Sequence, residues 1–399
     1  NRVDRMYEDP SGFLWLLTYD NRAHRFDPRT EAFERVPAEG ERGSAVNVTK
    51  IEALPGGAVW LLTETEGAIR IATNPEDYSL TSQWYSAQSG QFSATRVFGV
   101  YEDLSGNEWI LSDNGLGMLA AGQTTPASYF VDAAEREKKG GQAFYSCLEY
   151  DSEIYFGSDN GRVWCYQKEN GQFQLQNLPA SSRIVSINSV EGNELIFTTA
   201  KDGFFSYQPK TKALEHFPAS RFPNASIHSV YVDKASEVWF EQHIPGTVVH
   251  FNPRTRILKQ EKVPVEPTST DRSRPAFHIH EDINGVLWVH PYGGGFSYFD
   301  RKSNSLHPFY NSLSGSDWRF SNKIHAAFSD RQGDLWMCTH SKGLEKVTFR
   351  PSQFRVMTPM PHDYESLSNE VRALCEDMDQ NLWVGLKDGK LRVYDKKRV

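Results

Sequence analysis

Hydrophobic and polar positions alternate in short runs separated by turn residues, and one arrangement of these runs returns along the whole chain. Residues 327–349 give the clearest copy: one run ends at Asp330, Gly333 follows, an apolar pair ends at Trp336, and a polar loop closes at Gly343 before another run. Alternation with a period of two predicts half-buried β-strands, and the Asp-x-x-Gly and Lys-Gly segments predict tight turns. Each copy therefore predicts three short strands joined by two turns.

The position of the tryptophan in this pattern recurs nine times at intervals of 41 to 49 residues. The residues at that position are Trp15, Trp60, Trp109, Tyr155, Ile196, Trp239, Trp288, Trp336 and Trp383. A tryptophan has a large apolar surface that one three-stranded unit cannot bury, so neighbouring copies must cover each other. A period in the forties with three or four strands per copy is typical of β-propeller blades.

Several copies continue into a further hairpin. Residues 26–33, 251–255 and 299–309 place an aromatic residue before Asp or Asn, followed by a turn with basic residues. This predicts a fourth, outer strand, with the strand before the acidic turn innermost. We therefore expect an all-β fold, a β-propeller of four-stranded blades of about 46 residues.

The number of copies exceeds one ring of the usual size. Seven blades need about 320 residues, and nine are more than the four to eight blades of common propellers. We expect a seven-bladed ring over residues 1–310, followed over residues 311–399 by part of a second, tandem propeller or by closing blades of the first. The chain begins near the first strand of one unit and stops after the third strand of another, as expected for a part of a longer protein.

The charge and cysteine content exclude some classes. A net charge of -8 without a Lys/Arg-rich run argues against nucleic-acid binding, which needs a basic face. Cys147 and Cys165 fall on the first and third strands of one blade, too far apart for a disulfide, and no Cys/His metal spacing is present. We expect no cofactor and no metal. No hydrophobic leader or membrane-spanning run is present, so any membrane connection is expected through another segment of the parent protein.

A longer pattern, Glu/Asp-x-x-Gly-x-x-Trp-x-x-Thr followed by Gly-Leu, resembles the two-component regulator propeller repeat. The segments that carry it are 8–18, 281–288, 330–344 and 376–385, the last preceded by a similar lead-in at 367–374. The resemblance is strong at both ends of the chain and weak across residues 140–260. In that family the repeats build the periplasmic sensor of hybrid two-component systems in gut Bacteroidetes.

The resemblance implies a role. Family members sense breakdown products of complex glycans and activate the genes that use them. The expected function is thus periplasmic ligand sensing, with an oligosaccharide as ligand. The expected parent is a histidine kinase, dimeric in the full-length sensor, through domains absent from this chain. The repeated motif residues are scaffold in that family, so no ligand contact carries over.

Two other classes stay open. One is a secreted propeller enzyme, such as a polysaccharide or streptogramin-type lyase or a glycoside hydrolase, because Glu-Asp pairs recur at Glu8, Glu102, Glu281 and Glu376. Each pair, however, begins a tight turn in which Asp bonds its own backbone, and adjacent strand residues point to opposite faces. We therefore expect this region to have no catalytic residues. The other class is a protein-interaction scaffold.

Ligand contacts are expected in the loops at one face of the ring, where propellers usually present their sites. Long connections contain Trp84 and the pair Trp318 and Arg319, which offer a stacking surface and a bidentate donor. Two neighbouring second-to-third-strand loops add a polar set. This set consists of His290, Tyr292, His340 and Lys342. Core or interface roles for the tryptophans and solvated hairpin tips for the polar set are the alternatives.

Overall fold

The computed structural model divides the chain into two compact units, Asn1–Val347 and Thr348–Val399. The residues it describes are 3–36, 46–131, 143–224, 226–242, 244–263, 278–291, 296–309, 324–339, 343–348, 359 and 366–395. The described part of the chain forms nine antiparallel sheets, each a meander whose strands follow chain order.

The strands of the first four sheets are as follows. They are β1 (Val3–Glu8), β2 (Leu14–Thr18), β3 (Ala23–Asp27), β4 (Ala32–Arg35); β5 (Val48–Ala53), β6 (Val59–Thr63), β7 (Ala68–Thr73), β8 (Leu80–Tyr85); β9 (Val97–Glu102), β10 (Glu108–Ser112), β11 (Gly115–Leu119), β12 (Ala127–Tyr129); and β13 (Phe144–Tyr150), β14 (Glu153–Ser158), β15 (Val163–Gln167), β16 (Gln172–Gln176).

The remaining sheets of the first unit are these. They are β17 (Ile184–Val190), β18 (Glu194–Thr199), β19 (Phe204–Gln208), β20 (Ala213–Phe217); β21 (Ser229–Val232), β22 (Val238–Glu241), β23 (Thr247–Asn252), β24 (Ile257–Lys262); β25 (His278–Glu281), β26 (Leu287–His290), β27 (Ser297–Asp300), β28 (Ser305–Pro308); and β29 (Ile324–Ser329), β30 (Leu335–Thr339), β31 (Gly343–Val347). The second unit contains β32 (Val371–Glu376), β33 (Leu382–Leu386) and β34 (Leu391–Tyr394), and short 3-10 turns occur at Ala219–Arg221 and Leu367–Asn369.

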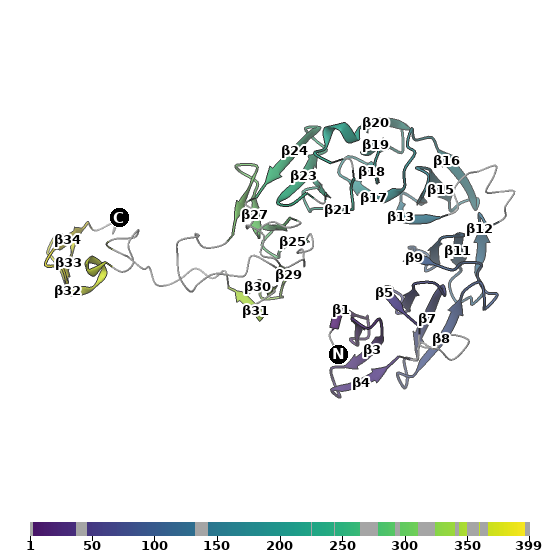
Figure 1. Ribbon diagram of the computed structural model, residues 1–399, viewed down its shortest axis with the longest axis horizontal. Helices are drawn as coiled ribbons and strands as arrows, with labels where there is room; N and C mark the ends of the chain where they lie inside the picture. Colours follow the sequence, from purple (N-terminus) through teal and green to yellow (C-terminus); the bar gives the residue numbers. More distant parts are fainter. Residues whose placement is uncertain are drawn as a thin grey trace. The chain divides into compact units, whose positions relative to one another are not determined.

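The repeat predicted from the sequence is confirmed in every sheet. All nine residues at the tryptophan position lie on second strands, and the first seven sheets have the expected fourth strand. Within the first unit, Figure 1 shows first strands such as β5, β9, β13 and β17 on the inner side and fourth strands such as β8, β16 and β20 on the outer side. The second strand is buried on both faces, as in β6 and β10, because it lies between the first and third strands and under the neighbouring sheets.

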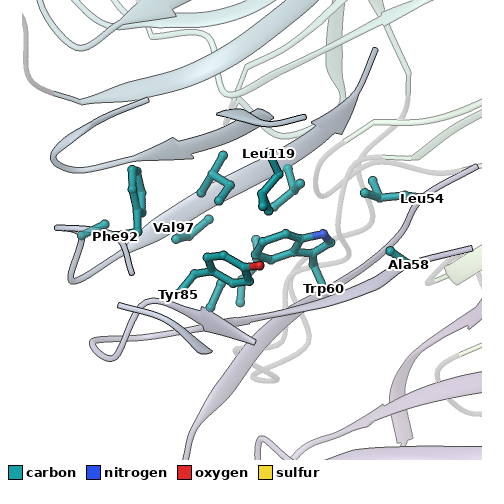
Figure 2. Packing of buried hydrophobic residues seen from close by; sticks show 12 residues of the cluster. Leu54, Ala58, Trp60, Tyr85, Phe92, Val97 and Leu119 are labelled. Atoms are coloured by element: carbon teal, nitrogen blue, oxygen red, sulfur yellow. The ribbon is translucent and has the colours of Figure 1, made fainter. Parts of the chain in front are cut away.

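The hydrophobic core lies between consecutive sheets. Seven apolar clusters are found among the described residues, and each joins one sheet of the first unit to the next along the chain. Figure 2 shows the cluster between the second and third sheets, where Trp60 and Tyr85 pack beneath Phe92, Val97 and Leu119. The expectation that the motif tryptophans are core between blades is confirmed for the five that belong to these clusters, Trp15, Trp60, Trp109, Trp239 and Trp288. Trp336 is half-buried and Trp383 is 37% exposed, so the expectation does not hold for Trp383.

A β-bulge recurs near the start of the first strand. In the third sheet Val97 pairs with Ser112 and Gly99 pairs with Leu111, so Phe98 is the extra residue. The same irregularity occurs in seven of the nine described sheets, in strands β1, β5, β9, β13, β17, β29 and β32. A bulge takes one side chain out of the regular alternation and redirects it.

Two sequence predictions concern chain organisation. The four cysteines are free, and Cys147 and Cys165 lie on the first and third strands of one sheet as expected. The four-stranded sheets end with β28, close to the predicted boundary at residue 310, whereas the three-stranded sheet β29–β31 belongs to the first compact unit. The division into a seven-bladed ring and a second propeller stays a prediction.

Candidate functional site

The acidic turn between the first and second strands is built around one aspartate. In the third sheet Asp103 Oδ1 accepts the backbone N–H groups of Ser105 at 2.8 Å and Asn107 at 3.0 Å. Its other oxygen accepts the indole N–H of Trp109 at 3.1 Å. Burial alone would raise the pKa of Asp103, but these hydrogen bonds outweigh it and hold that pKa below its ordinary value.

The same tryptophan-to-aspartate bond recurs in six sheets. The pairs are Trp15 with Asp9 (2.8 Å), Trp109 with Asp103 (3.1 Å), Trp239 with Asp233 (3.0 Å), Trp288 with Asp282 (3.0 Å), Trp336 with Asp330 (2.8 Å) and Trp383 with Asp377 (2.7 Å). The expected role of Asp as the residue that fixes the turn is confirmed, and the same carboxylate also satisfies the buried indole nitrogen.

The glutamate before the aspartate has a different partner. Glu102 Oε2 accepts the backbone N–H of Gly56 in the preceding sheet at 2.7 Å. In two further sheets the corresponding bonds are Leu104 N–H to Glu149 at 2.7 Å and Lys234 N–H to Glu281 at 2.8 Å. The two carboxylates of a Glu-Asp pair therefore point to separate places, and they do not form the converging pair that glycoside hydrolysis requires.

The second sheet lacks the turn aspartate and uses a neighbour instead. Leu54 occupies that position, and the indole N–H of Trp60 donates to Glu108 Oε2 of the third sheet at 2.7 Å. Arg70 Nη2 donates to the other oxygen of the same carboxylate at 2.6 Å. The missing turn aspartate of the second sheet is thus compensated by a carboxylate from the next sheet.

The opposite end of each of the first five sheets is closed by a hydroxyl group. Thr63 Oγ1 donates to the carbonyl of Gly67 at 2.8 Å across the hairpin between the second and third strands. The equivalent bonds are Thr18 to Arg22 (3.0 Å), Ser112 to Gly115 (2.8 Å), Ser158 to Arg162 (2.9 Å) and Thr199 to Gly203 (2.8 Å). We call this end the loop face: it contains these hairpins and the starts of the first strands that pair beside them.

Two of the expected ligand contacts lie in the described part of the chain. His290 ends β26 at the loop face with 0% of its surface exposed, so it is not a solvated hairpin tip. Trp84 was expected in a long connection, and this placement is wrong: Trp84 lies on the fourth strand β8 opposite Ile69, half-buried against the cluster between the first two sheets. The other five, Trp318, Arg319, Tyr292, His340 and Lys342, lie outside the described residues. A ligand role for these seven residues stays a prediction.

Four residues at the loop face form one continuous stack, which we call the inner platform: Arg96, Phe98, Tyr145 and Arg183. The rings of Phe98 and Tyr145 are stacked with centroids 4.2 Å apart and planes 29° apart. The Arg96 guanidinium carbon lies 5.3 Å from the Phe98 centroid, and that of Arg183 lies 4.8 Å from the Tyr145 centroid. Both arginines are exposed and both aromatic rings are half-buried.

The recurring bulge creates this platform. Phe98 and Tyr145 are the extra residues of the bulges in β9 and β13, and Arg96 and Arg183 immediately precede β9 and β17. None of the four belongs to the set expected from the sequence. The available signal was a break in alternation, because Val97 and Phe98 are consecutive apolar residues at the start of a run.

A cavity of about 380 Å³ lies at the rim of the first two sheets and is lined by Phe13, Arg25, Glu34 and Tyr78 among others. Arg25 Nη2 lies 2.6 Å from Glu34 Oε2, and the same nitrogen donates to the Tyr78 carbonyl at 2.9 Å. The other terminal nitrogen, Arg25 Nη1, is buried without a hydrogen-bond partner among the described residues. This rim site therefore contains one buried guanidinium group, whereas the inner platform presents two exposed ones.

Among the described residues, no group of three or more His, Cys, Asp or Glu side chains is arranged to hold a metal ion. No helix in the same part of the chain has the length and apolar character needed to cross a membrane.

These sheets define an all-β protein of the β-propeller class. Residues 366–388, which include β32 and β33, match the family described as Two component regulator propeller, so this segment is similar to a repeat of that family. The resemblance inferred from the sequence is confirmed by this match. A comparison with curated protein sequences found no match.

Solved structures with similar folds include an extracellular domain described for the hybrid two component system BT3049 of B. thetaiotaomicron. It has a TM-score of 0.52 and 15% identity, over 100% of this chain and 64% of that chain. The extracellular domain of a one component system, BT4673, from the same organism has a TM-score of 0.41 and 15% identity, over 100% and 65%. A streptogramin B lyase has a TM-score of 0.44 and 14% identity, over 86% and 92%. At 15% identity, the similarity to the BT3049 domain shows a shared fold and nothing more. The TM-scores of the BT4673 domain and the lyase are below 0.5, so these two similarities support no conclusion.

Proposed function

We propose that this chain is the periplasmic ligand-sensing region of a hybrid two-component sensor and that it binds a glycan-derived oligosaccharide. The parent protein then is a histidine kinase whose signalling controls polysaccharide-utilisation genes. The observation that carries the proposal is the match of residues 366–388 to the Two component regulator propeller family, on a chain whose nine sheets repeat one unit. The fold likeness to an extracellular domain of a hybrid two component system is consistent with it.

The roles found for the motif carboxylates support a binding function over an enzymatic one. The aspartates hold their own turns and the glutamates hold the turns of neighbouring sheets. Groups committed to several hydrogen bonds in this way are poorly suited to proton transfer. The loop face, by contrast, presents exposed cationic groups beside half-buried aromatic rings on a frame of strands.

Sensing requires more than binding. A ligand transmits a signal only when it binds one arrangement of the receptor more tightly than another. We therefore propose that the full-length sensor is a homodimer whose arrangement shifts on ligand binding.

Thermal melting of the purified chain against a panel of glycan fragments tests the proposal. A ligand that binds the native state raises the melting temperature by mass action. We expect an increase with one class of oligosaccharide and no shortened product on a sizing gel. Product formation would make the chain an enzyme, and no response across the panel would favour a protein-interaction scaffold.

A further inference from the structure

The arginines of the inner platform differ from Lys50 on β5 and from Lys168, which follows β15, because both lysines are neutralised by neighbouring carboxylates. Lys50 Nζ lies 2.5 Å from Glu52 Oε1, and Lys168 Nζ lies 2.5 Å from Glu149 Oε1. Within the described residues, neither Arg96 nor Arg183 forms an ion pair. Two exposed positive charges therefore stand together at the loop face of a chain whose net charge is -8.

The aromatic pair fixes the positions of these charges. Each guanidinium lies within the range of a cation–π interaction with one ring, and the rings stack on each other, so the order is Arg96, Phe98, Tyr145, Arg183. Either end of this stack therefore presents a guanidinium group to a ligand. Stacked arginines lose less freedom on binding than free ones, which favours affinity.

The backbone that carries both arginines is also held in place. Asp113, in the hairpin of the third sheet, accepts the backbone N–H groups of Thr95 at 3.2 Å and Arg96 at 3.1 Å. Asp202, in the equivalent hairpin of the fifth sheet, accepts those of Ser181 at 3.0 Å and Ser182 at 2.8 Å. The hairpins thus anchor the two segments that lead into the arginines.

We infer that the inner platform, Arg96, Phe98, Tyr145 and Arg183, binds an oligosaccharide that carries at least two acidic groups. The inference rests on the proposed function and specifies its ligand class. Guanidinium groups bind carboxylate or sulfate groups through paired hydrogen bonds, and two of them across one stack match two anionic groups on one ligand. Uronic acids and sulfated sugars share this chemistry.

Calorimetric titration of the whole chain with three tetrasaccharides tests this inference. One comes from polygalacturonic acid and carries only carboxylates, one comes from chondroitin sulfate and carries sulfates as well, and one from starch is neutral. We expect an acidic tetrasaccharide to bind and Arg96→Ala and Arg183→Ala each to raise its Kd about tenfold. Whichever acidic probe binds more tightly identifies the preferred anion.

The control variant is Arg29→Ala. Arg29 is also exposed, stacks over Tyr78 at 4.5 Å and carries the same charge, but it pairs with Asp27 at the rim of the first two sheets. Arg29→Ala should keep the Kd for the acidic probe within about twofold of the value for the unmodified chain, because this variant removes only a distant charge. If Arg29→Ala weakens binding as much as Arg96→Ala and Arg183→Ala do, the attraction is non-specific and the inference is overturned. Circular dichroism melts of all three variants establish that they are folded.

The remaining outcomes separate the inference from the proposed function. Binding of the neutral probe with no response to either acidic probe would support a glycan sensor and overturn the acidic ligand class. If none of the three probes binds, both the acidic ligand class and the proposed glycan-sensing function are contradicted.

Discussion

One carboxylate accepts bonds from two partly buried donors and one buried donor at the start of the acidic turn in the third sheet. Asp103 accepts bonds from two backbone N–H groups and from the indole of Trp109, and it is 3% exposed itself. Removing such an acceptor leaves donors without partners in a region that water reaches poorly. The sequence indicates only a turn-forming role for Asp103, but in the structure its carboxylate also bonds the indole of the core residue Trp109.

Asp103→Ala should lower the free energy of unfolding by about 2 kcal/mol, because the donors lose their acceptor. Urea denaturation followed by tryptophan emission measures the change. Leu104→Ala is the matched control: it lies in the same turn, and its side chain is 92% exposed. Equal stabilities of the two variants would show that the carboxylate does not hold the turn.

The same carboxylates predict how stability depends on pH. A hydrogen bond from Trp383 is the main cause that lowers the pKa of Asp377 to about 2 from 3.8, and Trp336 similarly lowers that of Asp330. A pKa that is lower in the folded state gives stability that is complete above the unfolded pKa and is lost as the pH falls toward the folded value. We expect denaturation midpoints to fall as the pH decreases from about 4 to about 2. Midpoints that stay constant over that interval would contradict this explanation.

At the scale of single elements, two glycines in the second sheet have the same type of backbone but different surroundings. Gly57 and Gly67 have φ values of +90° and +79°. A Cβ at Gly57 would meet nothing within 4 Å, whereas one at Gly67 would meet the Tyr85 carbonyl of the fourth strand. At Gly67, in the hairpin at the loop face, a side chain is therefore disfavoured both by the positive φ and by the nearby Tyr85 carbonyl.

Gly57→Ala should cost about 1–2 kcal/mol from backbone strain alone. Gly67→Ala should cost about 1–3 kcal/mol more, because the methyl group displaces the end of the fourth strand. Comparing the two in thermal melts separates strain from overlap. A Gly67 variant no less stable than the Gly57 variant would show that the fourth strand yields without cost.

The elements could be predicted from the sequence to very different degrees. Second strands were found at all nine positions because a buried strand between turns leaves a strong local pattern, even where Ile196 replaces tryptophan. The inner platform was not found, because it joins residues of three sheets through bulges that pairing creates. The bond from Trp60 to Glu108 was equally hidden, since it replaces a local partner by one 48 residues away.

At the scale of the whole molecule, stability comes from contacts between consecutive sheets. The seven apolar clusters of the described residues all belong to the first compact unit, and the last joins Trp288 and Phe296 to Leu335 and Met337. In such an arrangement each sheet is stabilised by its neighbours along the chain.

A fragment of residues 1–347 should therefore melt at the temperature of the corresponding transition in the full chain. A fragment of residues 1–310, the boundary expected from the sequence, should melt at a lower temperature because Trp288 and Phe296 lose their apolar partners. Calorimetry of both fragments measures the difference. Equal melting temperatures would place the boundary of the stable ring at residue 310.

The glutamate that reaches back to the preceding sheet has a consequence for biosynthesis. The turns at Gly56, Leu104 and Lys234 receive their carboxylate from residues 46, 45 and 47 positions later in the chain. A sheet leaving the ribosome therefore stays incomplete until one further repeat has been translated, and domains fold from the N-terminus as they emerge. Nascent-chain force measurements should show each folding step one repeat after the sheet itself has emerged, and a step at the sheet's own emergence would contradict this order.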